Sequence, residues 1–143
     1  TTPYAKSKTL AEKAAWDLAK AKGLKLTTIN PGLVLGPPLD EHYGSSLGLV
    51  ERLLKGKDPM LPGFGFPTVD VRDVAEMHLR ALQRPGTAGK RYLSAAGTLA
   101  MVEMGRILKA TYPTRRIATR EAPAFLIRLL SLFDPQIKAI LPK

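Results

Sequence analysis

Apolar and polar residues follow one another along the chain in blocks that predict helices and strands in turn. Apolar residues of the segment 7–22 recur at spacings of one, three and four, which places them on a single stripe of a helix. Gly23 follows as the expected helix cap. Residues 24–30 are rich in β-branched side chains and end at a proline, so they are expected to form a strand. A helix followed directly by a strand is typical of α/β folds.

The rest of the chain continues this alternation. The predicted elements are, in order, a loop over 31–38, a helix over 46–55, a strand over 66–71, a helix capped by Asp73 and continuing through Leu82, a strand over 90–95, and helices over 98–112 and 123–133. The loop is expected because proline and glycine interrupt the hydrogen bonding of both helices and strands.

Composition narrows the classes of protein that fit. With 143 residues, 45% of them hydrophobic, the chain can build one ordinary core. The absence of cysteine excludes disulfides, thiolate nucleophiles and cysteine-ligated metals, and it fits a reducing compartment. His42 and His78 lie too far apart in the sequence to suggest a metal site. Without any long apolar run, we expect a cytoplasmic protein that does not enter a membrane.

The net charge of +10 raises the alternative of a basic nucleic-acid-binding module. Such modules combine clustered cations with aromatic side chains on which bases stack. Here the aromatic residues are scattered along the chain and do not alternate with the basic ones. We therefore expect no nucleic acid partner.

The spacing of two residues near the start of the chain suggests acid–base chemistry. Tyr4 and Lys8 are four positions apart, so on a helix they project from the same face, one turn from each other. An ammonium group near a phenol favours the ionised form of the phenol. A phenol poised in this way can exchange a proton with a carbonyl or alcohol oxygen.

Three segments in order resemble the extended short-chain dehydrogenase family, also called the NAD-dependent epimerase/dehydratase family. The segment from Tyr4 to Trp16, YAKSKTLAEKAAW, is similar to the active-site helix of dihydroflavonol reductases and their bacterial relatives. NPGLVLGP, which begins at Asn30, resembles the family's loop at the nicotinamide end of the cofactor. VDVRDVA, which begins at Val69, is similar to a third family segment.

The resemblance implies an NAD(P)-dependent oxidoreductase that reduces a ketone or aldehyde by hydride transfer. Tyr4 would be the general acid, and Lys8 would assist it and bind the nicotinamide ribose. The implied site residues are Tyr4 and Lys8 for catalysis, Tyr4, Lys8, Pro31, Gly32, Leu33 and Val34 for NAD or NADP, and Leu39, Tyr43, Met60, Pro62 and Phe66 for the substrate. No metal is implied.

The implied fold is α/β: the C-terminal part of a Rossmann-type doubly wound sheet plus a small, mainly helical substrate-binding region. Residues 1–38 would complete the dinucleotide-binding fold, and residues 39–143 would form the substrate-binding region, interleaved with it. Because the family's Gly-rich phosphate loop and its Ser or Thr partner lie upstream of the tyrosine, we expect this chain to be an inactive fragment. An unpaired sheet edge would favour self-association, for example as a homodimer. A sugar-nucleotide epimerase or dehydratase, and a non-catalytic cofactor sensor, stay open as alternatives.

Overall fold

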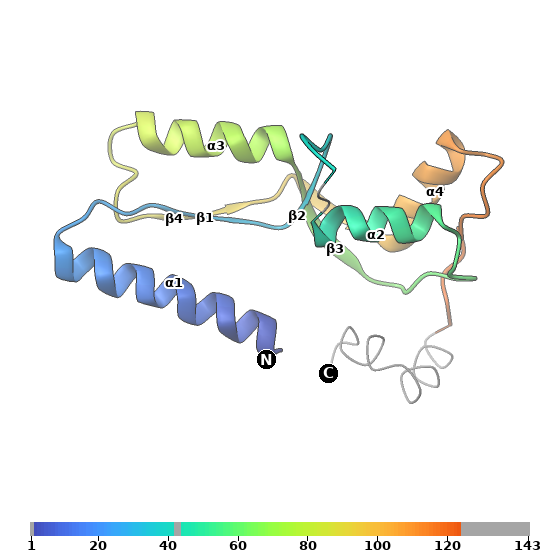
Figure 1. The fold of residues 1–143 in the computed structure, drawn as a ribbon, viewed down its shortest axis with the longest axis horizontal. Coiled ribbons are helices and arrows are strands. Elements are labelled where there is room, and N and C mark those ends of the chain that lie inside the picture. The colour runs from blue at the N-terminus through green and yellow to red at the C-terminus, as the bar shows by residue number, and fades with distance from the viewer. Residues whose placement is uncertain (1, 42–43, 124–143) are drawn as a thin grey trace.

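The computed structural model describes residues 2–41 and 44–123 of the chain. The elements are α1 (Pro3–Lys22), β1 (Thr28–Pro31), β2 (Leu33–Leu35), α2 (Ser45–Leu54), β3 (Gly65–Asp70), α3 (Val71–Gln83), β4 (Arg91–Ser94), β5 (Gly97–Ala100) and α4 (Met101–Thr111). Figure 1 shows α1 and α3 on opposite sides of β1 and β4, with α2 and α4 grouped beside β2 and β3. The predicted α/β fold class is confirmed.

Two small sheets organise the described residues. In the first, β1 and β4 pair in parallel, with Thr28 opposite Arg91 and Pro31 opposite Ser94. In the second, β3 lies between β2, which is parallel to it, and β5, which is antiparallel. Because β1 runs directly into β2 through Gly32, the chain passes from one sheet to the other at the carboxyl end of β1.

The first helix begins earlier than its apolar stripe predicted. Thr2 caps it, because the Thr2 Oγ1 accepts a hydrogen bond from the Ala5 N–H at 3.2 Å, and Pro3 occupies the first turn, where its missing N–H costs nothing. The helix ends as predicted at Gly23, which has a φ of 65°. Tyr4 and Lys8 therefore lie in the first two turns of α1.

Two predictions of secondary structure were wrong for the same reason. In both segments, pairing with a distant strand determines the structure, and the local sequence does not reveal that pairing. The loop predicted over 31–38 contains β2, because Leu33 to Leu35 pair with β3 between the flanking prolines. The helix predicted from residue 98 starts at Met101, because the preceding residues of β5 pair with β3. Apart from Pro123, the helix predicted over 123–133 lies outside the described residues.

The cap of α3 also differs from its prediction. Asp70, not Asp73, is the N-cap, and the Asp70 Oδ1 accepts a hydrogen bond from the Arg72 N–H at 2.8 Å. Asp73 lies in the first turn, where a carboxylate is favoured by the helix dipole.

The hydrophobic core lies between α2, α4 and the second sheet. Its buried residues are Leu53, Leu61, Met101, Val102 and Met104. The first sheet is covered differently. Ala19 is the buried residue of α1, and α3 has none among the residues described. Large apolar side chains consequently stay exposed on α1 and α3.

Gly105 allows α4 to approach the chain that follows it. A Cβ at this buried position would collide with the carbonyl oxygen of Ala118 and with Leu61 Cδ1. We expect Gly105→Ala to lower the free energy of unfolding of the chain by about 1 to 3 kcal/mol, because overpacking outweighs the better helix propensity of alanine. Urea denaturation measures the change.

Gly48 provides the matched control for that substitution. It lies in α2, and a Cβ there would meet nothing within 4 Å. Gly48→Ala should therefore raise the free energy of unfolding by up to about 1 kcal/mol. Equal effects of the two alanines would contradict the close approach at Gly105.

Candidate active site

Tyr4 and Lys8 lie together at the N-terminal end of α1. The Lys8 Nζ is 5.6 Å from the centroid of the Tyr4 ring, within the range of a cation–π contact. Tyr4 is 72% exposed, so its hydroxyl is accessible. Figure 1 shows this end of α1 on the same side of the molecule as the β1–β2 junction. Tyr4 and Lys8 therefore lie on the same face of α1, as their spacing predicts.

Pro31, Gly32, Leu33 and Val34 form the junction between the two sheets. The Gly32 N–H donates to the backbone oxygen of Ser94 at 3.0 Å, which ties the junction to β4. A Cβ on Gly32 would collide with the backbone carbonyl of Pro67, so glycine is what lets the junction lie against β3. Held on both sides, the junction is a rigid segment at the carboxyl end of β1.

Two buried polar groups at this edge have no hydrogen-bond partner among the described residues. They are the Asn30 Nδ2 and the Ser94 Oγ, at the carboxyl ends of two adjacent parallel strands. Buried polar groups are normally paired, and ligands of α/β sheets bind at the carboxyl ends of parallel strands. Buried polar groups without a partner at this edge fit a polar cofactor such as a nicotinamide dinucleotide. Sequence reasoning had not singled out Ser94.

Glu12 is a second residue that sequence reasoning missed. Its Oε1 accepts hydrogen bonds from Arg91 Nε at 2.8 Å and Thr28 Oγ1 at 3.0 Å. The hydrogen bond from Arg91, with a smaller contribution from Thr28, lowers the pKa of Glu12 below its usual value against an opposing effect of desolvation. A signal was present in the sequence, since Glu12 follows Lys8 by one helical turn.

The described residues that were predicted to bind substrate do not line the hollow at the ends of β2 and β3. Leu39 is fully exposed, and Met60 is partly exposed. Pro62 and Phe66 are half-buried, and the Phe66 ring meets Phe64 edge to face at 5.3 Å between ring centroids. Tyr43 lies outside the described residues. Substrate binding by these five residues stays a prediction.

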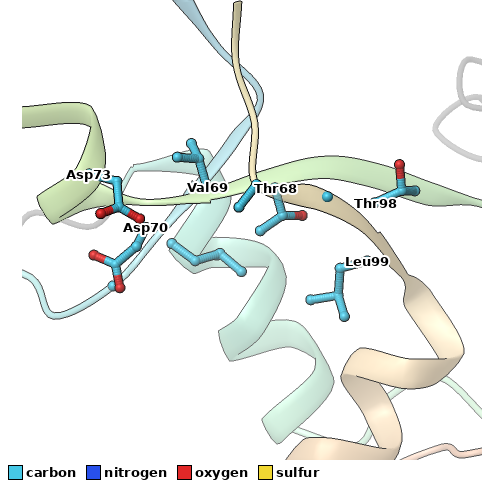
Figure 2. A pocket seen from close by; sticks show the side chains of 10 residues that line it. Thr68, Val69, Asp70, Asp73, Thr98 and Leu99 are labelled. Atoms are coloured by element: carbon cyan, nitrogen blue, oxygen red, sulfur yellow. The ribbon is translucent and has the colours of Figure 1, made fainter. Parts of the chain in front are cut away.

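A hollow of about 590 Å³ lies at the carboxyl ends of β2 and β3 (Figure 2). Its lining combines the carboxylates of Asp70 and Asp73, the hydroxyls of Thr68 and Thr98, and the apolar Leu99. Gly36 also lines it and has a φ of 146°, a backbone conformation that favours glycine. The hollow is open to solvent and adjoins the N-terminus of α3.

Asp70, on the rim of this hollow, gives the chain a testable response to acid. The hydrogen bonds from the Arg72 side chain and backbone N–H lower the pKa of Asp70 to about 2. A carboxyl group whose pKa is depressed on folding adds stability at neutral pH, and that stability is lost as the pH falls through the folded-state value. We expect the destabilisation caused by Asp70→Asn to be constant above about pH 5 and to shrink steadily between pH 4 and pH 2.

Unfolding of the wild type and the variant in urea at a series of pH values measures this difference. Glu76→Gln, which removes an exposed ion pair within α3, is the control. If the difference in the free energy of unfolding between Asp70→Asn and the wild type did not change with pH, the lowered pKa of Asp70 would be contradicted.

Within residues 2–41 and 44–123, no group of three or more histidine, aspartate or glutamate side chains is arranged to hold a metal ion. No helix of that part of the chain is long and apolar enough to cross a membrane.

A model of a known protein family matches the part of the chain that contains this site. The model described as the NAD dependent epimerase/dehydratase family matches residues 1–94, which include α1, the β1–β2 junction and α3. The chain belongs to this family. The resemblance seen in the three sequence segments is thereby confirmed.

Relatives within the NAD dependent epimerase/dehydratase family include reductases and an epimerase. Cinnamoyl-CoA reductase 2 of Arabidopsis thaliana is 38% identical over 117 residues, which cover 82% of this chain and 35% of the relative. The yeast methylglyoxal/isovaleraldehyde reductase complexed with NADPH is 31% identical, with a TM-score of 0.72 over 85% of this chain and 39% of the other.

The UDP-glucose 4-epimerase of Thermus thermophilus, in complex with NAD, is 27% identical and gives a TM-score of 0.63 over 86% of this chain and 41% of the epimerase. The chain thus spans between 35% and 41% of the length of these three proteins.

Proposed function

We propose that this chain acts as the C-terminal part of an NAD(P)-dependent reductase that converts a ketone or aldehyde to an alcohol. The observation that carries the proposal is the Lys8 ammonium over the Tyr4 ring, at the accessible end of α1 and on the side of the β1–β2 junction. The names of the relatives support reduction of carbonyl compounds, and the NADPH complex of the yeast reductase supports the cofactor class.

In the proposed mechanism each residue has a separate task. A bound reduced nicotinamide would supply the hydride to the carbonyl carbon. The Tyr4 hydroxyl donates a proton to the carbonyl oxygen, and the Lys8 ammonium stabilises the phenolate that this leaves. Lys8 has three donors, so it can also bind ribose hydroxyls. The backbone of Pro31 to Val34 would hold the nicotinamide end of the cofactor.

The two parts of the chain serve this reaction differently. Residues 1–38 supply α1 and the cofactor junction, and residues 39–143 supply the substrate region, with Leu39, Tyr43, Met60, Pro62 and Phe66 as its proposed contacts. In the described residues β1 pairs with β4 alone. Its open edge, and the exposed leucines Leu10, Leu18, Leu79 and Leu82 on α1 and α3, are the surfaces on which a Gly-rich nucleotide-binding part would pack.

The proposal is tested with a complete protein that contains this chain. Loss of absorbance at the reduced-nicotinamide band is followed with NADPH and with NADH, using isovaleraldehyde and methylglyoxal as probes. We expect consumption of the reduced cofactor with at least one of these carbonyl compounds. The 143-residue chain alone should give no turnover. A complete protein that binds NADPH and leaves both compounds unchanged would refute the proposal for this substrate class.

A second candidate is favoured by one comparison. The similarity to the UDP-glucose 4-epimerase supports a sugar-nucleotide epimerase or dehydratase, which would use the same tyrosine without net consumption of the cofactor. Incubation with UDP-glucose and NAD, followed by chromatography of the sugar nucleotides, separates the two activities.

A further inference from the structure

The contacts that hold α1 against the rest of the chain determine where Tyr4 and Lys8 lie. Few such contacts are present among the described residues. Ala19, near the end of the helix remote from Tyr4, is the residue of α1 that is buried. In the described residues, every side-chain hydrogen bond from α1 to another element is accepted by Glu12. The other side-chain hydrogen bonds of α1 stay within the helix or join it to its cap.

The Glu12 carboxylate joins three elements at one point. Thr28 and Arg91 are directly opposite each other in the register of β1 and β4, so their side chains share one face of the sheet. A single oxygen of Glu12 accepts from both, at 3.0 and 2.8 Å. The side chain of Glu12 is only 20% exposed, which shields its ion pair with Arg91 from solvent more than the other ion pair of α1. The Trp16 Nε1 adds a longer contact at 3.4 Å from within the helix.

The distance from Glu12 to Tyr4 along α1 is similar to the distance from Thr28 to Pro31 along β1. Tyr4 precedes Glu12 by eight residues, or about 12 Å along a helix axis. Pro31 follows Thr28 by three residues, or about 10 Å along a strand. Since α1 and β1 run in opposite directions, both segments extend from the Glu12 contact towards the same end of the sheet. A tilt or slide of α1 at Glu12 would therefore move Tyr4 and Lys8 relative to the cofactor junction.

We propose that Glu12 is a positioning residue of the active site, which holds Tyr4 and Lys8 in register with the Pro31 to Val34 junction through its contacts with Thr28 and Arg91. This rests on the proposed function for the identity of the site. Glu12 touches neither cofactor nor substrate in this account. It acts by fixing the helix that carries the proton donor, and a displacement of about 1 Å at such a donor can lower the rate about a hundredfold.

The test uses a complete protein that contains this chain, in three variants. Glu12→Ala removes the acceptor, and Thr28→Val removes one of its donors with a side chain of the same shape. Asp17→Asn is the matched control, because Asp17 is an exposed carboxylate of α1 whose ion pair among the described residues is with Lys13 of the same helix, at 2.7 Å. Thr28→Val keeps the test informative if Glu12→Ala fails to fold.

We expect Glu12→Ala to lower kcat about tenfold or more while KM for the carbonyl substrate stays within twofold. The isotope effect on kcat with NADPH deuterated at the transferred C4 hydrogen should increase, because a misplaced Tyr4 slows the chemical step. Thr28→Val should change kcat and the isotope effect in the same direction by a smaller factor, and Asp17→Asn should change neither. Loss of activity that followed the unfolded fraction, with an unchanged isotope effect, would overturn the proposal.

A second measurement does not depend on catalysis. Amide hydrogen exchange of residues 4–12, measured without substrate, should be faster in Glu12→Ala and Thr28→Val than in Asp17→Asn. If the wild-type protein reduces no carbonyl compound but shows this pattern, the proposed function fails while the anchoring by Glu12 stands. Exchange in Glu12→Ala equal to that in Asp17→Asn would overturn the anchoring itself.

Discussion

We expect Tyr4→Phe to lower the kcat of the proposed reductase by about 10²- to 10⁴-fold, the range for loss of a general acid. The substitution removes one oxygen and keeps the ring. The Lys8 Nζ, 5.6 Å from the ring centroid, retains its contact with the π-face. Because Tyr4 is largely exposed, no buried hydrogen bond is lost with the hydroxyl, and thermal stability should not change measurably.

Tyr112→Phe is the control for this prediction. Tyr112 also has a nearby cation, with Arg115 Cζ 5.8 Å from its ring centroid, and it is also exposed, but it lies at the C-terminal end of α4 and not on α1. Steady-state kinetics at saturating cofactor should show a loss for Tyr4→Phe alone. A Tyr4→Phe enzyme with wild-type kcat would remove Tyr4 from the mechanism.

Leu61→Ala lowers the free energy of unfolding of the chain by about 2 to 5 kcal/mol, the range for a leucine truncated in a rigid core. Leu61 is 1% exposed and packs among the buried residues of α2 and α4. Its own backbone cannot move to fill the void, because its N–H donates to the Arg120 oxygen and its oxygen accepts from the Ala122 N–H. The cavity therefore stays open in the variant.

Leu82→Ala is the matched control for the core substitution. Leu82 is 85% exposed on α3, so in the isolated chain its truncation should change the free energy of unfolding by less than about 0.5 kcal/mol. Urea denaturation followed by circular dichroism measures both variants. A Leu61→Ala chain as stable as Leu82→Ala would show that the core described here does not hold the chain together.

The sequence predicted most reliably what depends on local chemistry. The helix stripe, Gly23 as a C-cap and the strand around Tyr92 are encoded within a few residues, and all three are observed. The proximity of Tyr4 and Lys8 follows from helix geometry alone. The structure therefore places this pair together without help from long-range contacts.

What the sequence did not reveal depends on distant segments. Leu33 to Leu35 form a strand only because β3, more than thirty positions later, offers a parallel partner. Thr98 and Leu99 carry a helical spacing, but pairing with β3 makes them a strand. The contact between Glu12 and Arg91 could not be predicted for the same reason, since the two residues lie 79 positions apart in the sequence.

Asp70 and Asp73 illustrate a smaller kind of ambiguity. Both precede or begin the apolar stripe of α3, and both side chains suit a helix N-terminus. The end of β3 decides between them, because pairing with β2 extends as far as Asp70 and leaves that residue extended at the helix start. A local pattern could place the cap only to within one turn.

Tyr4 and Lys8 are proposed to serve net carbonyl reduction, and this role is tested by following the hydrogen that the cofactor transfers. A complete protein containing this chain is incubated with isovaleraldehyde and NADPH deuterated at the transferred C4 position, and the alcohol is examined by mass spectrometry. The account predicts one deuterium on the carbinol carbon, formed in step with cofactor oxidation and lost in Tyr4→Phe. Interconversion of UDP-sugars without net cofactor oxidation, and no labelled alcohol, would contradict it.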